Sequence, residues 1–272
     1  MNFEEYQTKF NCLPLNESEQ SKTFLVECEN KKRVCKKFPN LSDKIREESG
    51  YFYIGRKNLL QIPNLTFVGE DFLEIEFIES IRTPRLEESV KGVTKLYTQT
   101  RDKQQLQRLP FPLIDLSKDK IVYRLGYLRQ EMEKKDIEDK SILHDAKRFV
   151  ELNYNTSPER CLIHGDLKSS HILINEKGTN YIDLGLISIS TPWYDLAFLF
   201  MEQTEKERFL EKLIAITFEN LASIFKMSLN ETRNYLRSGI FYRCLYDFGF
   251  ALRHRTAKTI KRTMNELNWI IN

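Results

Sequence analysis

Three side chains that can bind a cation, Asp166, His171 and Asp183, lie close together in the sequence. Between His171 and Asp183, the run from Asn175 to Thr179 is rich in turn-forming residues and predicts a β-hairpin. If this turn is centred on Lys177, His171 and Asp183 are directly opposed on one face, with Cβ atoms about 4.5 to 5.5 Å apart. Asp166 lies on the loop that enters the hairpin. The spacing therefore predicts two carboxylates and one imidazole at one end of a β-ribbon, where they could share a metal ion.

The same spacing also allows a purely structural interpretation. His171 and Asp183 would then be a cross-strand polar pair, and Asp166 a turn residue. The opposite, apolar face of the hairpin would be formed by Ile172, Ile174, Ile182 and Leu184. A zinc hydrolase site built from His164, Asp166 and His171 is disfavoured, because no helical HExxH motif or cysteine partner accompanies them.

The elements that position these residues differ between the two halves of the chain. Up to about residue 80, short runs mix β-branched or aromatic residues with polar ones, which predicts a small antiparallel sheet interrupted by one helix. The predicted strands are 24–28, 33–38 and 72–78, with a hairpin loop at 29–32 and a helix over 44–57 that follows cap residues at 41–43.

After Pro84 the apolar residues recur with a helical period. The predicted helices are 86–106, 119–137, 140–153, 203–226, 229–252 and 256–270, and among them lie the β-like segments 161–163, 171–174 and 180–184. No internal repeat and no linker rich in Gly, Ser or Pro separates the halves. We therefore expect two lobes of one compact α+β unit.

Composition and charge exclude several classes of protein. With 272 residues, 41% of them hydrophobic, the chain can bury a core, which excludes disorder and small disulfide scaffolds. The formal net charge of +3 is too small for a dedicated nucleic-acid binder. The 5 cysteines include no CxxC pair, and the sequence has neither a leader peptide nor a membrane-spanning run, so we expect a cytoplasmic protein without a membrane span.

Three motifs in order along the chain carry a specific resemblance. They are the runs Ile163 to Ile174 (IHGDLKSSHILI), Tyr181 to Gly185 (YIDLG) and Pro192 to Ala197 (PWYDLA). In their order and spacing they resemble the aminoglycoside phosphotransferase and choline kinase family, which has a protein-kinase-like fold. The resemblance implies a bilobal α+β structure. Residues 1–78 would form a small antiparallel nucleotide-binding lobe with one helix, and residues 79–272 a larger, mainly helical lobe for catalysis and acceptor binding.

The resemblance also implies roles for residues of the catalytic loop. Asp166 matches the aspartate that accepts the proton of the acceptor hydroxyl and orients that oxygen for attack on the γ-phosphate. Lys168 matches a lysine that neutralises the transferring phosphate, and a solvated lysine is the alternative. His164 would anchor the loop to the backbone and Asp195 would brace it, although Asp195 also fits as the N-terminal acid of a helix.

For the metal, the resemblance implies Mg²⁺ held by Asp183, because a hard cation prefers carboxylate oxygen. His171 stands where most members of the family have an asparagine as second ligand, and imidazole favours Mg²⁺ less than an amide oxygen does. Aminoglycoside 2''-phosphotransferases and the lipopolysaccharide-core sugar kinases are similar in carrying histidine at this place. Whether His171 binds a second metal therefore stays open.

In the N-terminal lobe, Lys36 rather than Lys37 matches the lysine that holds the α- and β-phosphates, when Val34, Phe38 and Pro39 are aligned with the family. Glu47 matches the helix carboxylate that pairs with this lysine, and Glu48 is the alternative. Isolated lysines and glutamates are mostly surface residues, so both assignments depend on the motifs downstream.

The same lobe should contain the loop over the phosphates and the hinge that binds the base. The loop before Phe24 has no glycine, so the hydroxyls of Ser18 or Ser21 would take the place of backbone amides. The backbone carbonyl of Glu76 and the amide of Ile78 match the hinge. Because backbone atoms make these contacts, ATP and GTP remain equally possible donors.

The resemblance thus implies a phosphotransferase that moves the γ-phosphate of ATP or GTP to a hydroxyl of a small molecule, such as a sugar, an amino alcohol or an antibiotic, with no nucleic-acid partner. A macromolecular or lipid-linked acceptor, such as a lipopolysaccharide-core sugar or a protein serine, is the first alternative. A kinase-like binding protein without activity is the second. The basic stretch from Arg233 to Arg262 argues mildly against a polycationic acceptor, although a solvated helix face explains it as well.

Overall fold

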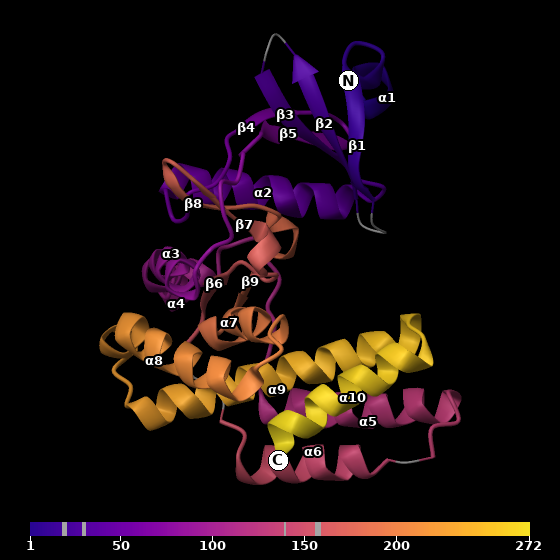
Figure 1. Ribbon diagram of the computed structural model, residues 1–272, viewed down its shortest axis with the longest axis vertical. Helices are drawn as coiled ribbons and strands as arrows, with labels where there is room; N and C mark the ends of the chain where they lie inside the picture. Colours follow the sequence, from indigo (N-terminus) through magenta and orange to yellow (C-terminus); the bar gives the residue numbers. More distant parts are fainter. Residues whose placement is uncertain (18–20, 29–30, 139, 156–158) are drawn as a thin grey trace. The chain divides into compact units, whose positions relative to one another are not determined.

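The computed structural model describes residues 1–17, 21–28, 31–138, 140–155 and 159–272 (Figure 1). The chain divides into two compact units, and each unit combines two separate stretches of sequence. The first unit comprises Met1–Pro112 and His164–Ser188, and the second comprises Leu113–Ile163 and Ile189–Asn272. These units do not follow the expected boundary between residues 78 and 79, so the assignment of the lobes 1–78 and 79–272 to nucleotide and acceptor stays a prediction.

The first unit contains a five-stranded antiparallel sheet in the order β1-β2-β3-β5-β4. Its strands are β1 (Asn11–Glu17), β2 (Lys22–Cys28), β3 (Lys31–Lys37), β4 (Leu65–Val68) and β5 (Phe72–Glu76). β2, β3 and β5 confirm the predicted strands to within a few residues. β1 is an exposed edge strand whose pairing with β2 is irregular between Pro14 and Asn16. The sequence did not predict this strand, because proline is uncommon within strands. Residues 29 and 30 of the predicted loop lie outside the described residues.

A short N-terminal helix, α1 (Phe3–Gln7), covers part of this sheet and is not among the predicted helices. It begins with a capping box between Asn2 and Glu5. The apolar cluster beneath it consists of the buried side chains of Phe3, Tyr6, Val26, Cys35 and Phe72. The cluster is a core of the sheet that does not involve the candidate site.

Glu74 of β5 is a buried carboxylate, only 3% exposed, that joins four elements of the first unit. It accepts hydrogen bonds from the Tyr6 hydroxyl of α1, from the Arg33 guanidinium of β3 and from the Thr66 hydroxyl of β4. A buried charge is tolerated only when it is paired and hydrogen-bonded, and these three donors meet that requirement.

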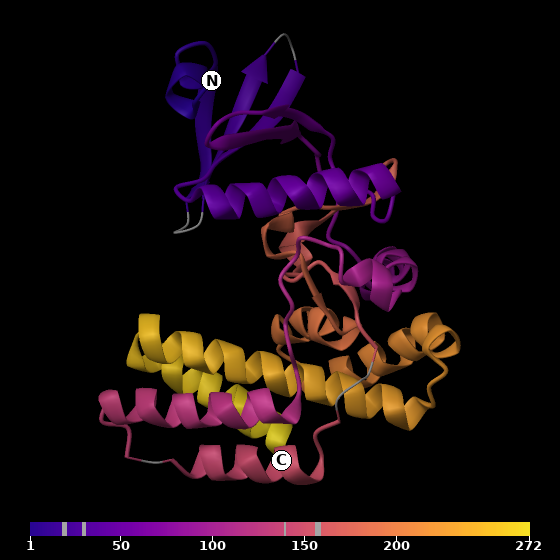
Figure 2. The ribbon, with the colours of Figure 1, turned by 180° about the vertical axis from the view of Figure 1, so that it is seen from behind.

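The helix α2 (Leu41–Lys57) lies along one side of the sheet in both views (Figures 1 and 2). It confirms the predicted helix, but its N-cap is Asn40, whose side chain accepts from the Ser42 amide, rather than a residue of 41–43. Its buried face packs against the short 3₁₀ turn η2 (Leu184–Leu186). A Cβ at Gly50 would lie 3.1 Å from Leu184 Cβ, so the glycine permits this close contact.

The hairpin that carries the metal-binding candidates is formed by β7 (Ile172–Asn175) and β8 (Gly178–Tyr181). Its register is one residue away from the predicted one. Asn175 pairs with Gly178 across a two-residue turn, and the Asn175 side chain accepts from the Lys177 amide. Ile172 consequently pairs with Tyr181 rather than with Ile182, and the buried residues of the hairpin are Ile172, Ile174, Asn180 and Tyr181. The prediction of the directly opposed pairs was therefore wrong.

Helix α3 (Leu86–Gln99) and the short α4 (Lys103–Leu106) complete the first unit. The sequence predicts one helix over 86–106. The structure breaks it at Thr100, and Asp102 then caps α4 by accepting from the amides of Gln104 and Gln105. An aspartate whose side chain bonds to backbone amides favours a new helix start over an uninterrupted helix.

The second unit is mainly helical. It contains α5 (Lys118–Lys134), α6 (Ser141–Leu152), α7 (Pro192–Met201), α8 (Lys206–Phe225), α9 (Leu229–His254) and α10 (Ala257–Ile271), besides β6 (Cys161–Ile163), which pairs with β9 (Ser188–Ser190). α9 packs against α5, α7, α8 and α10 (Figure 2). The helices predicted in this unit, over 119–137, 140–153, 203–226, 229–252 and 256–270, are confirmed, whereas α7 was not predicted. α7 has no amphipathic period because Pro192 to Phe200 are all buried, so the periodicity could not predict it.

All 5 cysteines are free thiols. Among the described residues, no helix is both long enough and apolar enough to cross a membrane. The antiparallel sheet in the N-terminal part and the helices in the C-terminal part confirm the α+β class.

Candidate active site

An ammonium group shared by two carboxylates forms the centre of the candidate site. Lys36 Nζ, on β3, lies 2.7 Å from Glu47 Oε2 of α2 and 2.8 Å from Asp183 Oδ1, which follows β8. Lys36 is 13% exposed and the Glu47 side chain only 2%. The structure thus brings together three residues that the sequence assigned to nucleotide and metal binding. Glu48, the alternative to Glu47, instead pairs with Lys44 at 2.9 Å.

The pKa values of the three ionisable groups in this cluster are shifted in different directions. Burial disfavours the ammonium ion, yet the two neighbouring carboxylates raise the pKa of Lys36 above its usual value. Burial raises the pKa of Glu47 to about 7 against the opposing effect of Lys36. Burial acts in the same direction on Asp183, but Lys36 and His171 outweigh it and lower the pKa of Asp183 to about 2. Near neutral pH, Lys36 is therefore a cation and Asp183 a full anion.

The backbone at Asp183 explains how this carboxylate reaches two partners. The Ile182 amide donates to the His171 carbonyl at 3.0 Å, which continues the hairpin by one residue. At Asp183 the chain adopts a left-handed conformation, with φ 60° and ψ 64°, before it enters η2. This conformation costs a non-glycine residue energy, and such residues cluster at functional sites. It directs Asp183 toward Lys36 and His171 in spite of the altered hairpin register.

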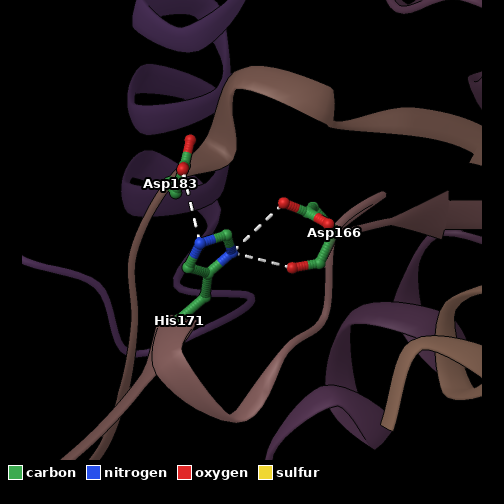
Figure 3. Close-up of side chains that lie close together, drawn as sticks. All are labelled: Asp166, His171 and Asp183. Atoms are coloured by element: carbon green, nitrogen blue, oxygen red, sulfur yellow. Dashed lines mark hydrogen bonds and ion pairs between the residues drawn. The ribbon is translucent and has the colours of Figure 1, made fainter. Parts of the chain in front are cut away.

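The loop from Asp166 to His171 folds back on itself (Figure 3). His171 Nδ1 lies 2.9 Å from the carbonyl oxygen of Asp166, and the Lys168 amide donates to the same oxygen at 2.8 Å. A carbonyl oxygen only accepts, so Nδ1 carries a proton, and the lone pair is on Nε2 whenever the ring is neutral. Nε2 lies 3.5 Å from Asp183 Oδ2. Lys168 Nζ lies 2.7 Å from Asp166 Oδ2, so the lysine is paired rather than merely solvated.

His164 contacts the backbone of Asp166 and of Ile182, and its anchoring role stays a prediction. It is fully buried, and its Nε2 donates to the Ile182 carbonyl at 2.9 Å while its Nδ1 accepts from the Asp166 amide at 3.4 Å. Burial lowers the pKa of His164 to about 4, so the ring is neutral and this tautomer satisfies both contacts. Next to it, Gly165 has φ 85°, and a Cβ there would lie 1.9 Å from the Leu186 oxygen. Only glycine fits this position.

Ligand atoms of Asp166, His171 and Asp183 all lie within 4.8 Å of one another. Two carboxylates suit a divalent hard cation, and the Nε2 lone pair of His171 offers a third, softer ligand. The donor set therefore fits a divalent metal ion, with Mg²⁺ favoured by the carboxylates. The imidazole nitrogen of His171 favours Mg²⁺ less than an oxygen ligand would.

A small cavity lies beside Lys36 and the carboxylates of Asp166 and Asp183. Its lining comprises Ser21, Lys36, Phe38, Asp43, Glu47, Asp166, Asp183, Gly185 and Leu186. Ser21 and Lys36 thus line the same cavity, whereas Ser18 lies outside the described residues. Sequence reasoning missed Asp43 and Gly185. Gly185 follows the aspartate in the YIDLG motif, and a Cβ there would lie 3.0 Å from Glu47 Oε2, so the motif glycine carried a usable signal.

The remaining predicted residues are not among those that line this cavity. Glu76 ends β5, and its amide donates to the Asn64 carbonyl at 2.9 Å while its carboxylate accepts from the Asn64 side chain. Ile78 follows two residues later, and the role of both in binding a base stays a prediction. Asp195 is fully buried in the first turn of α7, in the second unit. The first-turn position agrees with its interpretation as a helix N-terminal acid, and the bracing role stays a prediction.

Residues 85–224 match the model of the phosphotransferase enzyme family, APH, a match that covers just over half of the chain and includes Asp166, His171 and Asp183. The chain belongs to this family. Lys36 and Glu47 lie outside the matched range, so their placement beside Asp183 is independent of the match. No curated protein sequence gives a significant match to this family member.

Solved structures similar to this phosphotransferase family member share its fold at low sequence identity. The gentamicin complex of APH(2")-IIa is 17% identical with a TM-score of 0.68, and the match covers 98% of this chain and 96% of the other. A choline kinase from Cryptosporidium parvum Iowa II is 10% identical, with a TM-score of 0.66 and coverage of 97% and 89%. The GDP complex of aminoglycoside 2'-phosphotransferase-IIIa is 16% identical, with a TM-score of 0.64 and coverage of 96% and 92%. The protein-kinase-like fold expected from the motifs is thereby confirmed.

Proposed function

We propose that this protein transfers the γ-phosphate of ATP or GTP to a hydroxyl group of a small molecule. The observation that carries the proposal is the Lys36 ammonium held between Glu47 and Asp183, in the same compact unit as Asp166. A binding scaffold has no need for a buried lysine, a strongly acidic carboxylate and a second carboxylate that converge on one small cavity.

In this proposal, Lys36 binds the phosphates of the donor. An ammonium ion has three N–H donors, and Glu47 and Asp183 occupy two of them, so the third is available for a phosphate oxygen. Glu47 fixes the direction of the lysine side chain from the helix. A bound Mg²⁺, held by Asp183 and His171, would neutralise charge on the β- and γ-phosphate oxygens. The GDP complex of the solved aminoglycoside 2'-phosphotransferase supports testing GTP beside ATP.

Asp166 activates the acceptor in this proposal. Its carboxylate accepts the proton of the hydroxyl while that oxygen forms a new bond to the γ-phosphorus, and the bond from the γ-phosphorus to the bridging oxygen breaks to release the nucleoside diphosphate. Lys168 lies 2.7 Å from Asp166 and can compensate charge on the transferring group. The backbone contacts of His164 and His171 hold Asp166 in place before substrate arrives.

The first test is calorimetric binding of ATP and GTP, with and without Mg²⁺, to the wild type and to Asp183→Ala. We expect Mg²⁺ to strengthen nucleotide binding to the wild type by at least about tenfold, and this gain to disappear in the variant, because the Asp183 carboxylate lies next to both Lys36 and His171. Asp145→Ala, an exposed carboxylate on α6, is the matched control and should bind as the wild type does.

Absence of nucleotide binding to the wild type would overturn the proposal and favour a kinase-like binding protein. An Asp183→Ala variant that keeps the full effect of Mg²⁺ would refute the metal-binding role of Asp183. If binding is as expected, phosphoryl transfer is measured with labelled donor against sugars, amino alcohols and antibiotics.

A further inference from the structure

The second unit contains a pocket of about 530 Å³ that the candidate active site does not use. Its lining comes from α5, α7 and α9 and from the segment that precedes α5. Much of the wall is phenolic and is formed by Tyr123, Tyr127, Tyr194, Tyr242 and Tyr246. Tyrosines combine an apolar ring face with a hydroxyl that donates and accepts, so this wall suits a ring that carries hydroxyl groups.

Three cationic side chains share the pocket with these rings: Lys120, Arg124 and Arg253. Arg124 Cζ lies 4.7 Å from the ring centre of Tyr246 and 5.8 Å from that of Tyr242. Arg253 Cζ lies 5.8 Å from the ring centre of Tyr127. The ring faces that could attract a cationic ligand are therefore already next to guanidinium groups.

Carboxylates compensate this charge only in part, since the Glu131 carboxylate, which is not part of the lining, interacts electrostatically with Arg253. Asp115 is the acid of the lining, and its Oδ1 accepts from the Ser117 amide at 3.0 Å and lies 3.7 Å from Arg160. Within the described ranges of the chain, no carboxylate lies within ion-pair distance of Lys120, Arg124 or Arg253, and the buried Nε of Arg124 has no hydrogen-bond partner. The pocket therefore has an excess of positive charge that an anionic group could neutralise.

We propose that this pocket binds a small hydroxylated anion, in which a carboxylate or phosphate group meets Arg124 and Arg253 and a ring lies against the tyrosines. A planar guanidinium forms paired hydrogen bonds with carboxylate and phosphate oxygens, which gives both affinity and orientation. A polycationic ligand of the aminoglycoside type is disfavoured by the same three cations. The charge preference of the pocket rests on its own lining and does not depend on the proposed function.

The test is a binding screen by ligand-detected NMR with hydroxylated ring fragments. Each scaffold is supplied as a carboxylate, a phosphate ester, a neutral alcohol and an amine, so that charge varies while shape is held nearly constant. For the scaffolds that bind, we expect a carboxylate or phosphate form to bind at least about tenfold more tightly than the amine. The preference should fall severalfold in Arg124→Gln and in Arg253→Gln. Arg129→Gln, an exposed residue of the same helix α5, removes the same charge outside the pocket and should keep the preference.

Equal or tighter binding of amines, failure of every anion to bind, or a preference that persists in both pocket variants would overturn the inference. Circular dichroism melting of each variant shows whether the fold is retained, and Arg253→Gln, at an exposed position, serves if Arg124→Gln is unstable. Fragment binding requires no nucleotide, so anion binding without nucleotide binding refutes the proposed function alone.

Discussion

At the scale of single residues, Asp166 is proposed to act in the chemical step and not in nucleotide binding. Its carboxylate contacts Lys168, whereas Lys36, the proposed phosphate ligand, contacts Glu47 and Asp183. We expect Asp166→Asn to lower kcat by about 10² to 10⁴, the usual contribution of a general base, and to leave the Kd for MgATP within about twofold. Steady-state kinetics and calorimetry measure the two quantities. An equal loss of nucleotide affinity would show that Asp166 is not the base.

His171 determines the ligand type at the cation site. Its Nδ1 is bound to the Asp166 carbonyl, and its Nε2 faces Asp183. Nitrogen suits Mn²⁺ better than Mg²⁺, so we expect His171→Asn, which substitutes an amide oxygen, to shift nucleotide binding severalfold toward Mg²⁺ relative to Mn²⁺. Calorimetry with each metal gives the ratio. An unchanged ratio, with the fold intact, would mean that His171 acts only on the Asp166 loop.

Some residues of the site could be predicted and others could not. Lys36, Glu47 and Asp183 come from three distant segments, and motif positions alone selected them, because no local pattern reports a contact between β3, α2 and the segment after β8. The proximity of His171 and Asp183 was predicted from a register that is wrong by one residue. The left-handed backbone of Asp183 restores the contact, and such a conformation at a non-glycine residue has no sequence signal.

At the scale of elements, Glu74 joins α1, β3, β4 and β5 through its buried carboxylate. Burial alone would favour the neutral acid, but hydrogen bonds from Thr66, Tyr6 and Arg33 outweigh burial and lower the pKa of Glu74. The ionised form therefore stabilises the fold above the pKa of the unfolded chain, near 4.3, and this stabilisation is lost as the pH falls through the lower folded value.

We expect Glu74→Gln to reduce the free energy of unfolding at pH 7 by about 2 kcal/mol, as for hydrogen bonds to a charged group. The loss should shrink below pH 4, where the wild-type carboxyl becomes protonated. Urea denaturation at several pH values measures the difference. Glu70→Gln, an exposed carboxylate in the turn before β5, is the control. A difference that stays constant from pH 7 to pH 3 would contradict the ionised state assigned to Glu74.

Helices with a marked amphipathic period could be predicted, although α9, which is buried along most of its length, was predicted as well. Helices such as α5 and α10 expose one face, and the period of their apolar residues identified them. α7 is buried on every side and has no such period, and β1 contains Pro14 at an irregular edge. Tertiary packing rather than a local sequence pattern determines where both elements form. Because β1 is an exposed edge strand, its sequence lacks the apolar alternation by which a strand is predicted.

At the scale of the whole molecule, the chain interleaves its two compact units. The stretch His164–Ser188 completes the first unit after the intervening stretch Leu113–Ile163 has entered the second. Its contacts with the N-terminal stretch include the Tyr181 hydroxyl on the Ser89 carbonyl at 3.0 Å and the Ile81 amide on the Ile174 carbonyl at 2.8 Å. Because the predicted boundary at residue 78 assumed contiguous lobes, sequence alone could not indicate this exchange of segments.

We therefore expect residues 1–112 alone to lack a cooperative thermal transition, because α2 and α3 would expose the faces that η2 and β8 cover. Residues 1–112 joined by a flexible linker to residues 164–188 contain the complete first unit and should melt cooperatively. Circular dichroism distinguishes the two chains. A sharp transition of the 1–112 fragment would show that the hairpin is dispensable for the fold of the first unit.

The late return of the hairpin also matters during synthesis. The ribosome must translate the whole stretch from Leu113 to Ser188 after Pro112 before the first unit is complete. At about 5 to 20 residues per second this takes roughly 4 to 15 s. During that time Asp183 has not yet been synthesised to pair with Lys36, and the face of α2 that η2 covers in the folded unit is exposed. The nascent chain is thus a client for chaperones that shield exposed apolar surface, and slow codons between residues 113 and 188 would prolong that exposure.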